Sequence, residues 1–150
     1  MTINTSFFGT SLQILSTFTF PAGFQVTQFA DDSDPIDFPS LKIGDGAMGP
    51  NGDLNVWSSA APIPMNLNII ASSDDDKNLS ILAENSRVGR GKLAIPELIT
   101  ASLVYPDGSL VTLTGGKIVG AHFARSATNV GRYKTKAYNF LFENLNGTLY

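Results

Sequence analysis

Cysteine is absent from this 150-residue sequence, and histidine occurs only once. The missing thiols exclude disulfides, thiolate catalysis and cysteine-ligated zinc. With 43% hydrophobic and 15% charged residues, the composition is typical of a globular protein and not of a disordered chain. A chain of this length fits one domain, so we expect a single domain over residues 1–150 whose core needs no cross-links.

Long apolar runs are also lacking. No stretch approaches the length of about 18 residues that a membrane-spanning helix requires. Residues 1–8 lack the basic start and the apolar run that mark a signal peptide. We therefore expect neither a leader sequence nor a membrane partner.

Charge is distributed unevenly between the two halves of the chain. Residues 1–76 hold nine acids and one base, a net charge of −8, whereas residues 77–150 hold nine bases and four acids, a net charge of +5. Complementary halves are suited to head-to-tail contact between copies of the chain. They can equally neutralise each other within one fold, and the sequence leaves both interpretations open.

Alternating apolar and polar residues predict about eight strands and one helix. The patterns at 11–20 and 24–29 predict an antiparallel hairpin, and those at 98–105 and 110–114 predict a second hairpin around a Pro-Asp-Gly turn. The remaining strands are expected at residues 41–43, 54–57, 65–69, 117–119 and 132–142. The predicted fold class is mainly β, a sandwich or barrel of antiparallel strands with one flanking helix.

Two of the predicted strands have distinct faces. Met65, Leu67 and Ile69 alternate with Asn66 and Asn68, which predicts one buried face and one wet or interface-facing side. The last strand places its aromatic residues on one side, and these are Tyr138, Phe140 and Phe142.

The helix is predicted at residues 74–85. Ser73 is a natural N-cap, and Asp74, Asp75 and Asp76 occupy the first turn, where the helix dipole favours negative charge. These aspartates therefore need no functional explanation. The remaining segments are predicted to be loops and turns, at residues 31–39, 44–53, 86–92 and 120–131.

Catalytic and metal-binding chemistry find little support in the sequence. An acidic cluster, Asp31, Asp32, Asp34 and Asp37, lacks the spacing and the closing glutamate of a calcium loop, so we interpret it as solvated or partner-facing. His122 stands alone in a loop of small residues, without a neighbouring nucleophile motif. We expect no catalytic residue, no cofactor and no metal.

Basic segments are equally poor candidates for ligand sites. Residues 89–92 lack the spacing of a phosphate-binding loop. Specific nucleic-acid binding is disfavoured by a pI near 4.9. Lys134 and Lys136 share one face of a predicted strand, which we interpret as a solvated sheet face or a salt-bridged subunit contact.

Four segments carry a resemblance to a known family. They are FPAGFQVTQFADDSDP at 20–35, MGPNGDL at 48–54, NSRVGRGK at 85–92 and YPDGS at 105–109. These segments resemble small structural proteins of contractile-tailed, myovirus-type phages, whose members carry tail-fibre or tail-structural labels. The predicted architecture is similar to that of tail-tube subunits instead, because a fibre usually shows repeats or a long shaft.

The resemblance implies a non-enzymatic virion protein, assembled in the host cytoplasm. It implies homo-oligomeric rings, hexameric and stacked head to tail, that form the inner tail tube or a baseplate-proximal ring. The implied partners are the tail sheath, the tape-measure and baseplate proteins, and DNA that passes through the lumen during genome ejection without specific binding. The candidate subunit-interface residues are Asp31, Asp32, Asp34, Asp37, Arg87, Arg90, Lys92, Arg125, Arg132, Lys134 and Lys136.

Within such an assembly, we expect exposed strand edges to pair between neighbours, and the acidic loop to meet residues 86–92 or 120–136 of an adjacent subunit. An alternative interpretation is a receptor- or carbohydrate-binding β-sandwich of a tail fibre or cell surface. Its candidate aromatic residues are Trp57, Tyr133, Tyr138 and Tyr150.

Overall fold

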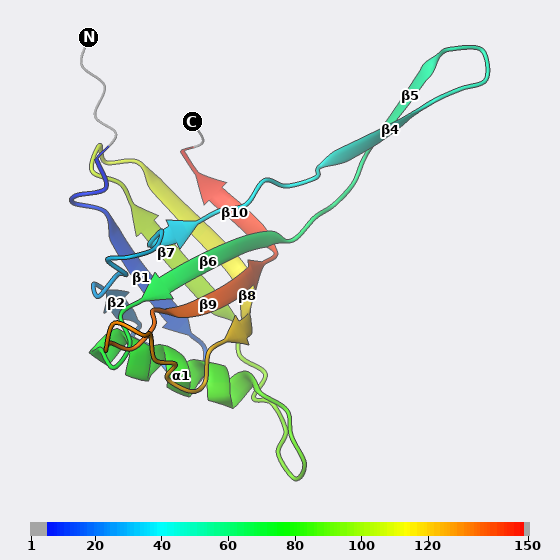
Figure 1. Cartoon of the computed structure of the whole chain (residues 1–150). Coiled ribbons are helices and arrows are strands. Elements are labelled where there is room, and N and C mark those ends of the chain that lie inside the picture. Colours follow the sequence, from blue (N-terminus) through cyan, green and yellow to red (C-terminus); the bar gives the residue numbers. More distant parts are fainter. Residues whose placement is uncertain (1–5, 149–150) are drawn as a thin grey trace.

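The structure is a computed structural model and describes residues 6–148. Two antiparallel sheets enclose the core, and one helix closes an end of the sandwich (Figure 1). The strands are β1 (Ser11–Ser16), β2 (Phe24–Val26), β3 (Ile36–Asp37), β4 (Gly44–Met48), β5 (Leu54–Ser58), β6 (Ile63–Ile69), β7 (Ile99–Val104), β8 (Leu110–Ala121), β9 (Lys136–Phe142) and β10 (Asn144–Gly147). The helix is α1 (Asp74–Ser86).

The two sheets share the long strand β8. Its first half pairs with β7 and β10, in the order β2-β1-β7-β8-β10, which we call the first sheet. Its second half pairs with β9, in the order β8-β9-β6-β3, which we call the second sheet. The transition lies at Gly115, whose φ of +67° favours glycine, and at Gly116. A Cβ at Gly116 would lie 2.3 Å from the Phe142 ring, so only glycine fits there.

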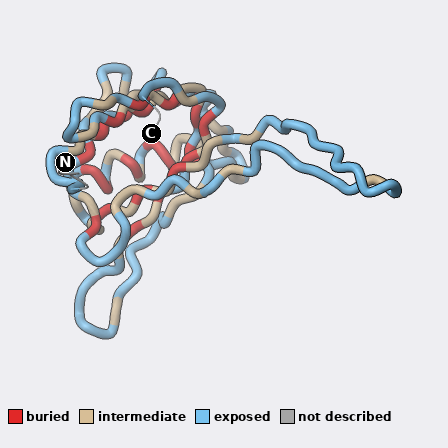
Figure 2. Tube along the Cα trace, turned by 90° about the horizontal axis from the view of Figure 1, so that it is seen from above, coloured by how far each residue is buried: buried red, intermediate tan, exposed pale blue. Residues whose placement is uncertain are grey.

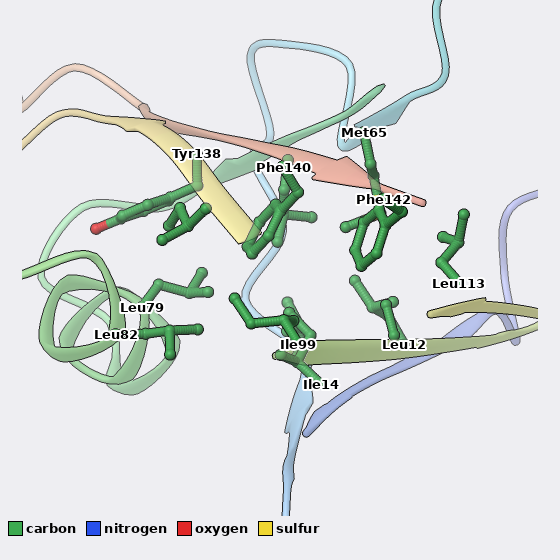
Figure 3. Close-up of a cluster of buried hydrophobic side chains, with 14 of the residues drawn as sticks. Leu12, Ile14, Met65, Leu79, Leu82, Ile99, Leu113, Tyr138, Phe140 and Phe142 are labelled. Carbon is green, nitrogen blue, oxygen red and sulfur yellow. The ribbon is translucent and has the colours of Figure 1, made fainter. Parts of the chain in front are cut away.

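The core fills the space between the sheets and α1 (Figure 3). As the alternation predicts, Met65, Leu67 and Ile69 of β6 are fully buried. Their partners across the core come from every major element, and they include Leu12, Ile14, Leu79, Leu82, Ile99, Leu103, Leu113, Tyr138, Phe140 and Phe142. Fully burying one such side chain stabilises the fold by about 1.5–3 kcal/mol, so this cluster accounts for most of the stability.

Most predicted elements are confirmed, and so is the mainly β fold class with one helix. Both hairpins form, as β1–β2 and β7–β8, and residues 117–119 continue the sheet as part of β8. The helix begins after its predicted cap, because the Ser73 hydroxyl accepts a hydrogen bond from the Asp76 N–H at 3.2 Å. Within residues 6–148, no helix has the length and apolar character that a membrane crossing requires.

Three sequence predictions are wrong in detail. Residues 41–43 are not a strand, and β4 forms at Gly44–Met48, inside the segment predicted to consist of turns. The last strand begins at Lys136, four residues later than expected. The acidic loop contains the two-residue strand β3. In each case cross-strand pairing decided the boundary, which a local pattern does not contain.

The two faces of β6 give a test of the core. Replacing fully buried Leu67 with alanine removes three side-chain carbons from the core and is expected to lower the free energy of unfolding by about 2–5 kcal/mol. Asn66→Ala, on the opposite face of the same strand, is the matched control and is expected to change it by about 0.5 kcal/mol or less. Urea denaturation measures both, and equal effects would contradict the assignment of faces.

Candidate assembly surfaces

A hairpin of β4 and β5 extends away from the body of the protein (Figures 1 and 2). Every residue of both strands is exposed. Five residue pairs hold the two strands together, and the turn between them closes through the Gly49 N–H, which donates to the Asp53 carbonyl oxygen at 2.7 Å. Neither strand pairs with a third strand of the described chain.

The two faces of this hairpin differ in chemistry. Pairing of Met48 with Leu54 and of Gly46 with Val56 places three large apolar side chains on one face, which we call the apolar hairpin face. Met48, Leu54 and Val56 are 63–71% exposed. Leu54 and Val56 lie over Gly46, because a Cβ there would sit 3.3 Å from Val56 Cγ1. The opposite face carries Asp45, Ala47, Asn55 and Trp57.

An isolated two-stranded hairpin is marginally stable in water. Here it also exposes contiguous apolar side chains, and such patches mark interaction sites. The apolar hairpin face is therefore the strongest candidate surface for association.

The first sheet ends in two open edges. β2 pairs only with β1, and β10 pairs only with β8, among the residues that the structure describes. Both edge strands are short, which limits uncontrolled pairing while leaving N–H and C=O groups available to a neighbour. These edges are the places where strand pairing between subunits can occur.

Two residues of the acidic loop are paired with side chains of their own chain, one of them basic. Asp31 Oδ1 lies 3.1 Å from Arg132 Nη2. The Thr135 hydroxyl donates to Asp32, and this hydrogen bond is the main cause that holds the pKa of Asp32 below its ordinary value. Part of the charge complementarity between the two halves is thus satisfied within the fold.

The basic segment after α1 is also tied to its own chain. Arg87 Nη2 lies 2.8 Å and Lys92 Nζ 2.9 Å from Glu84 Oε1. Hydrogen bonds from Arg87 and then Lys92 lower the pKa of Glu84 from 4.5 to about 2. Because this folded-state pKa is depressed, the contacts contribute stability above pH 4.5 and lose it as the pH falls toward 2.

Lys136 corrects the interpretation of the last strand. Its side chain does not lie on a solvated sheet face or at a subunit contact, because the residue is only 4% exposed. Its Nζ pairs with Asp76 Oδ1 at 3.2 Å, and the Tyr138 hydroxyl donates to the same oxygen at 2.6 Å. Burial, then this hydrogen bond, raises the pKa of Tyr138. Lys136 is a structural residue that joins β9 to α1.

The remaining predicted interface residues have no ion pair within the described chain. They are Asp34, Asp37, Arg90, Arg125 and Lys134. Arg125 is held in place without a carboxylate, since its Nη1 donates to the Ser72 hydroxyl at 3.0 Å and its guanidinium lies over the Tyr133 ring. These five charges are free to meet a partner.

The aromatic residues named for a binding groove do not gather in one place. Tyr138 is fully buried in the core, which contradicts its assignment to a groove. Trp57 lies on the hairpin, whereas Tyr133 lies in the loop before β9, and both are about half exposed. Tyr150 lies outside the described residues.

His122 makes a backbone contact between neighbouring strands. The His122 Nδ1 accepts a hydrogen bond from the Ala137 N–H at 3.3 Å, which connects the end of β8 to β9. Among residues 6–148, no group of three or more His, Asp or Glu side chains is arranged to hold a metal ion.

The sequence prediction missed two features. The apolar hairpin face was hidden because glycines at β4 suggested turns. Asp75 was explained by the helix dipole alone, yet it is buried, and its Oδ2 accepts hydrogen bonds at 2.7 Å from the N–H groups of Thr27 and Gln28. These two hydrogen bonds of Asp75 leave no local sequence signal, because the donors lie 47 and 48 residues away in the chain.

Comparison with known proteins decides the family. The model of a family described as "Tail fiber protein gp32" matches residues 3–146. The chain belongs to this family. The resemblance to a phage-tail protein family, stated on the sequence segments, is thereby confirmed. No curated protein sequence matches the chain.

Solved structures from contractile injection systems share the fold of this tail fiber gp32 family member. The anti-feeding prophage cap, which terminates the tube, matches with a TM-score of 0.56 and 10% identity over 100% of this chain and 95% of that one. The sheath/tube terminator of the extracellular system PVC matches with a TM-score of 0.56 and 7% identity over 99% of both chains. A chain of the PVC sheath-tube complex matches with a TM-score of 0.52 and 8% identity over 93% and 88%.

The two lysines before and within β9 separate a structural role from a surface role. Lys136→Met leaves the buried Asp76 carboxylate without its cation and is expected to lower the free energy of unfolding by about 3–5 kcal/mol. Lys134→Met removes an exposed charge from the same segment and is expected to cost about 0.5 kcal/mol or less. Denaturant titration measures the free energy of unfolding of both variants. A Lys136→Met protein as stable as the wild type would argue against the buried ion pair.

Proposed function

We propose that this protein is a non-enzymatic structural subunit of a contractile phage tail, and that it assembles with copies of itself into stacked rings of the tube type. The observation that carries the proposal is the apolar hairpin face. Its three large apolar side chains are 63–71% exposed, and a two-stranded hairpin that carries them needs a partner surface to be stable. A ring of identical subunits supplies such a surface to every hairpin.

The comparisons support this function in two ways. The family is one of phage tail proteins, and the shared fold occurs in chains of a sheath-tube complex, a tube cap and a sheath/tube terminator. We propose hexameric rings stacked head to tail, either as the repeating tube or as a specialised connector ring near the baseplate. The sheath, tape-measure and baseplate proteins would be its neighbours, and DNA would pass through the lumen during ejection from the virion.

The unpaired charges give the rings a means of stacking. Asp34 and Asp37 lie on the acidic loop, and Arg90, Arg125 and Lys134 lie on the basic segments 86–92 and 120–136. We propose that these two sets meet between adjacent subunits, where opposite potentials set the register. The other charged residues proposed for the interface form ion pairs within the chain and hold their own loops in place. They include Arg87, Lys92, Asp31 and Arg132.

Substitution of the apolar hairpin face tests assembly directly. Leu54→Asp with Val56→Asp places charges where apolar contact is proposed, and it is expected to leave the protein folded but monomeric. Asn55→Asp, on the opposite face of the same strand, is the control and is expected to assemble as the wild type does. Sedimentation velocity and negative-stain electron microscopy measure the state, and circular dichroism confirms folding. Wild-type protein that stays monomeric at high concentration would contradict the proposed function.

Charge reversal tests the stacking contact separately. Arg90→Glu is expected to raise the protein concentration needed for assembly by about tenfold, a loss of about 1.4 kcal/mol, because like charges then face each other. Lys117→Glu makes the same charge change at an exposed position of β8, outside both basic segments, and serves as the control. The difference should shrink in high salt. Identical assembly of both variants at low salt would remove this contact from the proposal.

A second candidate function is suggested by the tail-fibre description of the family and by the half-exposed Trp57. In that role the hairpin would present Trp57 to a cell-surface receptor or glycan. A glycan array probed with wild-type and Trp57→Ala protein distinguishes the two functions. Tryptophan-dependent binding by a protein that does not form rings would favour the receptor-binding module.

A further inference from the structure

The outward face of the first sheet has an unusual composition. The strand register aligns one residue from each of its five strands into a single row across the sheet. All five are uncharged and polar, and they are Gln25, Gln13, Ser102, Thr112 and Asn146. We call this set the polar row.

The neighbouring outward positions are uncharged as well. Three large aliphatic residues lie among hydroxyl and amide side chains, and the outward positions beside the polar row are Ser11, Leu15, Thr100, Val104, Leu110, Thr114 and Asn144. The chain has 23 charged side chains, and none occupies an outward position on β1, β2, β7, β10 or the part of β8 that belongs to the first sheet, since Lys117 lies on the part that pairs with β9. Soluble surfaces carry roughly a quarter to a third charged residues, so a whole sheet face without them requires an explanation.

This chemistry excludes several kinds of binding. Without Lys or Arg, the face cannot neutralise phosphates, which supply most of the affinity of proteins for DNA. Without aromatic rings, it cannot stack bases or provide the anchors of a tight protein interface. Without Asp or Glu, it does not repel a polyanion either. The polar row therefore offers a passing phosphate backbone neither attraction nor repulsion through charge.

The same sheet has the open edges that a ring needs. Among residues 6–148, β2 at one end and β10 at the other each have a free edge, so neighbouring subunits can continue the sheet in both directions. Its inward face is committed to the core, and only the outward face can line an enclosed space.

The second sheet is less suited to this position. Its outward face carries Asp37 and Lys117. It is also partly covered by the acidic loop, because Asn68 Nδ2 donates to the Asp34 carbonyl oxygen at 2.6 Å.

From these observations we infer that the first sheet forms the inner wall of the ring, with the polar row facing the lumen and the DNA duplex that moves through it. The inference rests on the proposed ring assembly and adds which sheet lines the lumen and why. Hydroxyl and amide groups keep their water, so a duplex can slide past without forming the salt-dependent contacts that would hold it.

The absence of native cysteine allows a direct test. Ser102→Cys and Thr112→Cys each place one thiol on the polar row, and two positions guard against failure of one variant to fold. Each variant is treated with a small maleimide and with a maleimide coupled to a globular protein too large for the lumen. Labelling is compared, by mass spectrometry and gel shift, between assembled rings and the dissociated subunit.

A lumen position predicts a specific result. The dissociated subunit reacts with both reagents, whereas the assembled ring reacts with the small reagent and loses labelling by the bulky one. Labelling of assembled rings by the bulky reagent would place the row on the outside, and protection from both would place it in a subunit contact. Either result overturns this inference while leaving ring assembly intact, whereas a protein that never assembles fails at the earlier step and overturns the proposed function too.

A second variant tests the reason for the missing charge. Thr112→Lys is expected to assemble normally and to make the rings retain a short fluorescent duplex at low salt, with release as salt rises. Wild-type rings should retain none. Retention by wild-type rings would show that the wall binds DNA after all and would overturn the sliding role of the polar row.

Discussion

β8 takes part in both sheets, and the rest of the architecture depends on this one strand. It can pair with β7 and β10 at its start and with β9 at its end only because Gly115 and Gly116 allow the chain to bend and the Phe142 ring to pass close to the backbone. Without the bend, the aromatic residues of β9 would not face the aliphatic residues of β1 and β7. The core and the closing position of α1 both follow from it.

Charge is used in two ways in this fold. The buried Lys136–Asp76 pair is expensive to desolvate, yet with the Tyr138 hydroxyl it fixes how α1 lies against β9, and it is satisfied entirely within the chain. The exposed pairs around Glu84 and Asp31 are weaker and hold loops in place. The charges left over lie on one acidic loop and two basic segments, and these remain available to partners.

Prediction from the sequence succeeds where a strand has one buried face and fails where pairing partners decide. Leu67 and Phe140 occupy the inward positions that alternation assigns to them. The period of two puts Lys136 on the same face as Tyr138 but says nothing about distant partners. Its charge was therefore interpreted as part of a solvated face or a subunit contact, and the contact between Asp75 and the backbone after β2 was missed. In the hairpin, glycine suggested turns, although at Gly46 it makes room for the side chains of Val56 and Leu54. Long-range pairing and close approach are tertiary properties that local patterns do not encode.

The two exposed surfaces with unusual composition are complementary in what they need. Exposure of the apolar hairpin face to water is unfavourable and its burial is favourable, so the proposed assembly places it between subunits. The polar row gains nothing from contact with protein, because it has neither apolar anchors nor charges to pair, so it belongs where water remains. A closed ring provides both environments from identical subunits, with covered interfaces and a hydrated lumen. A monomer provides only the hydrated environment, and the apolar hairpin face would then remain exposed to water without a partner surface.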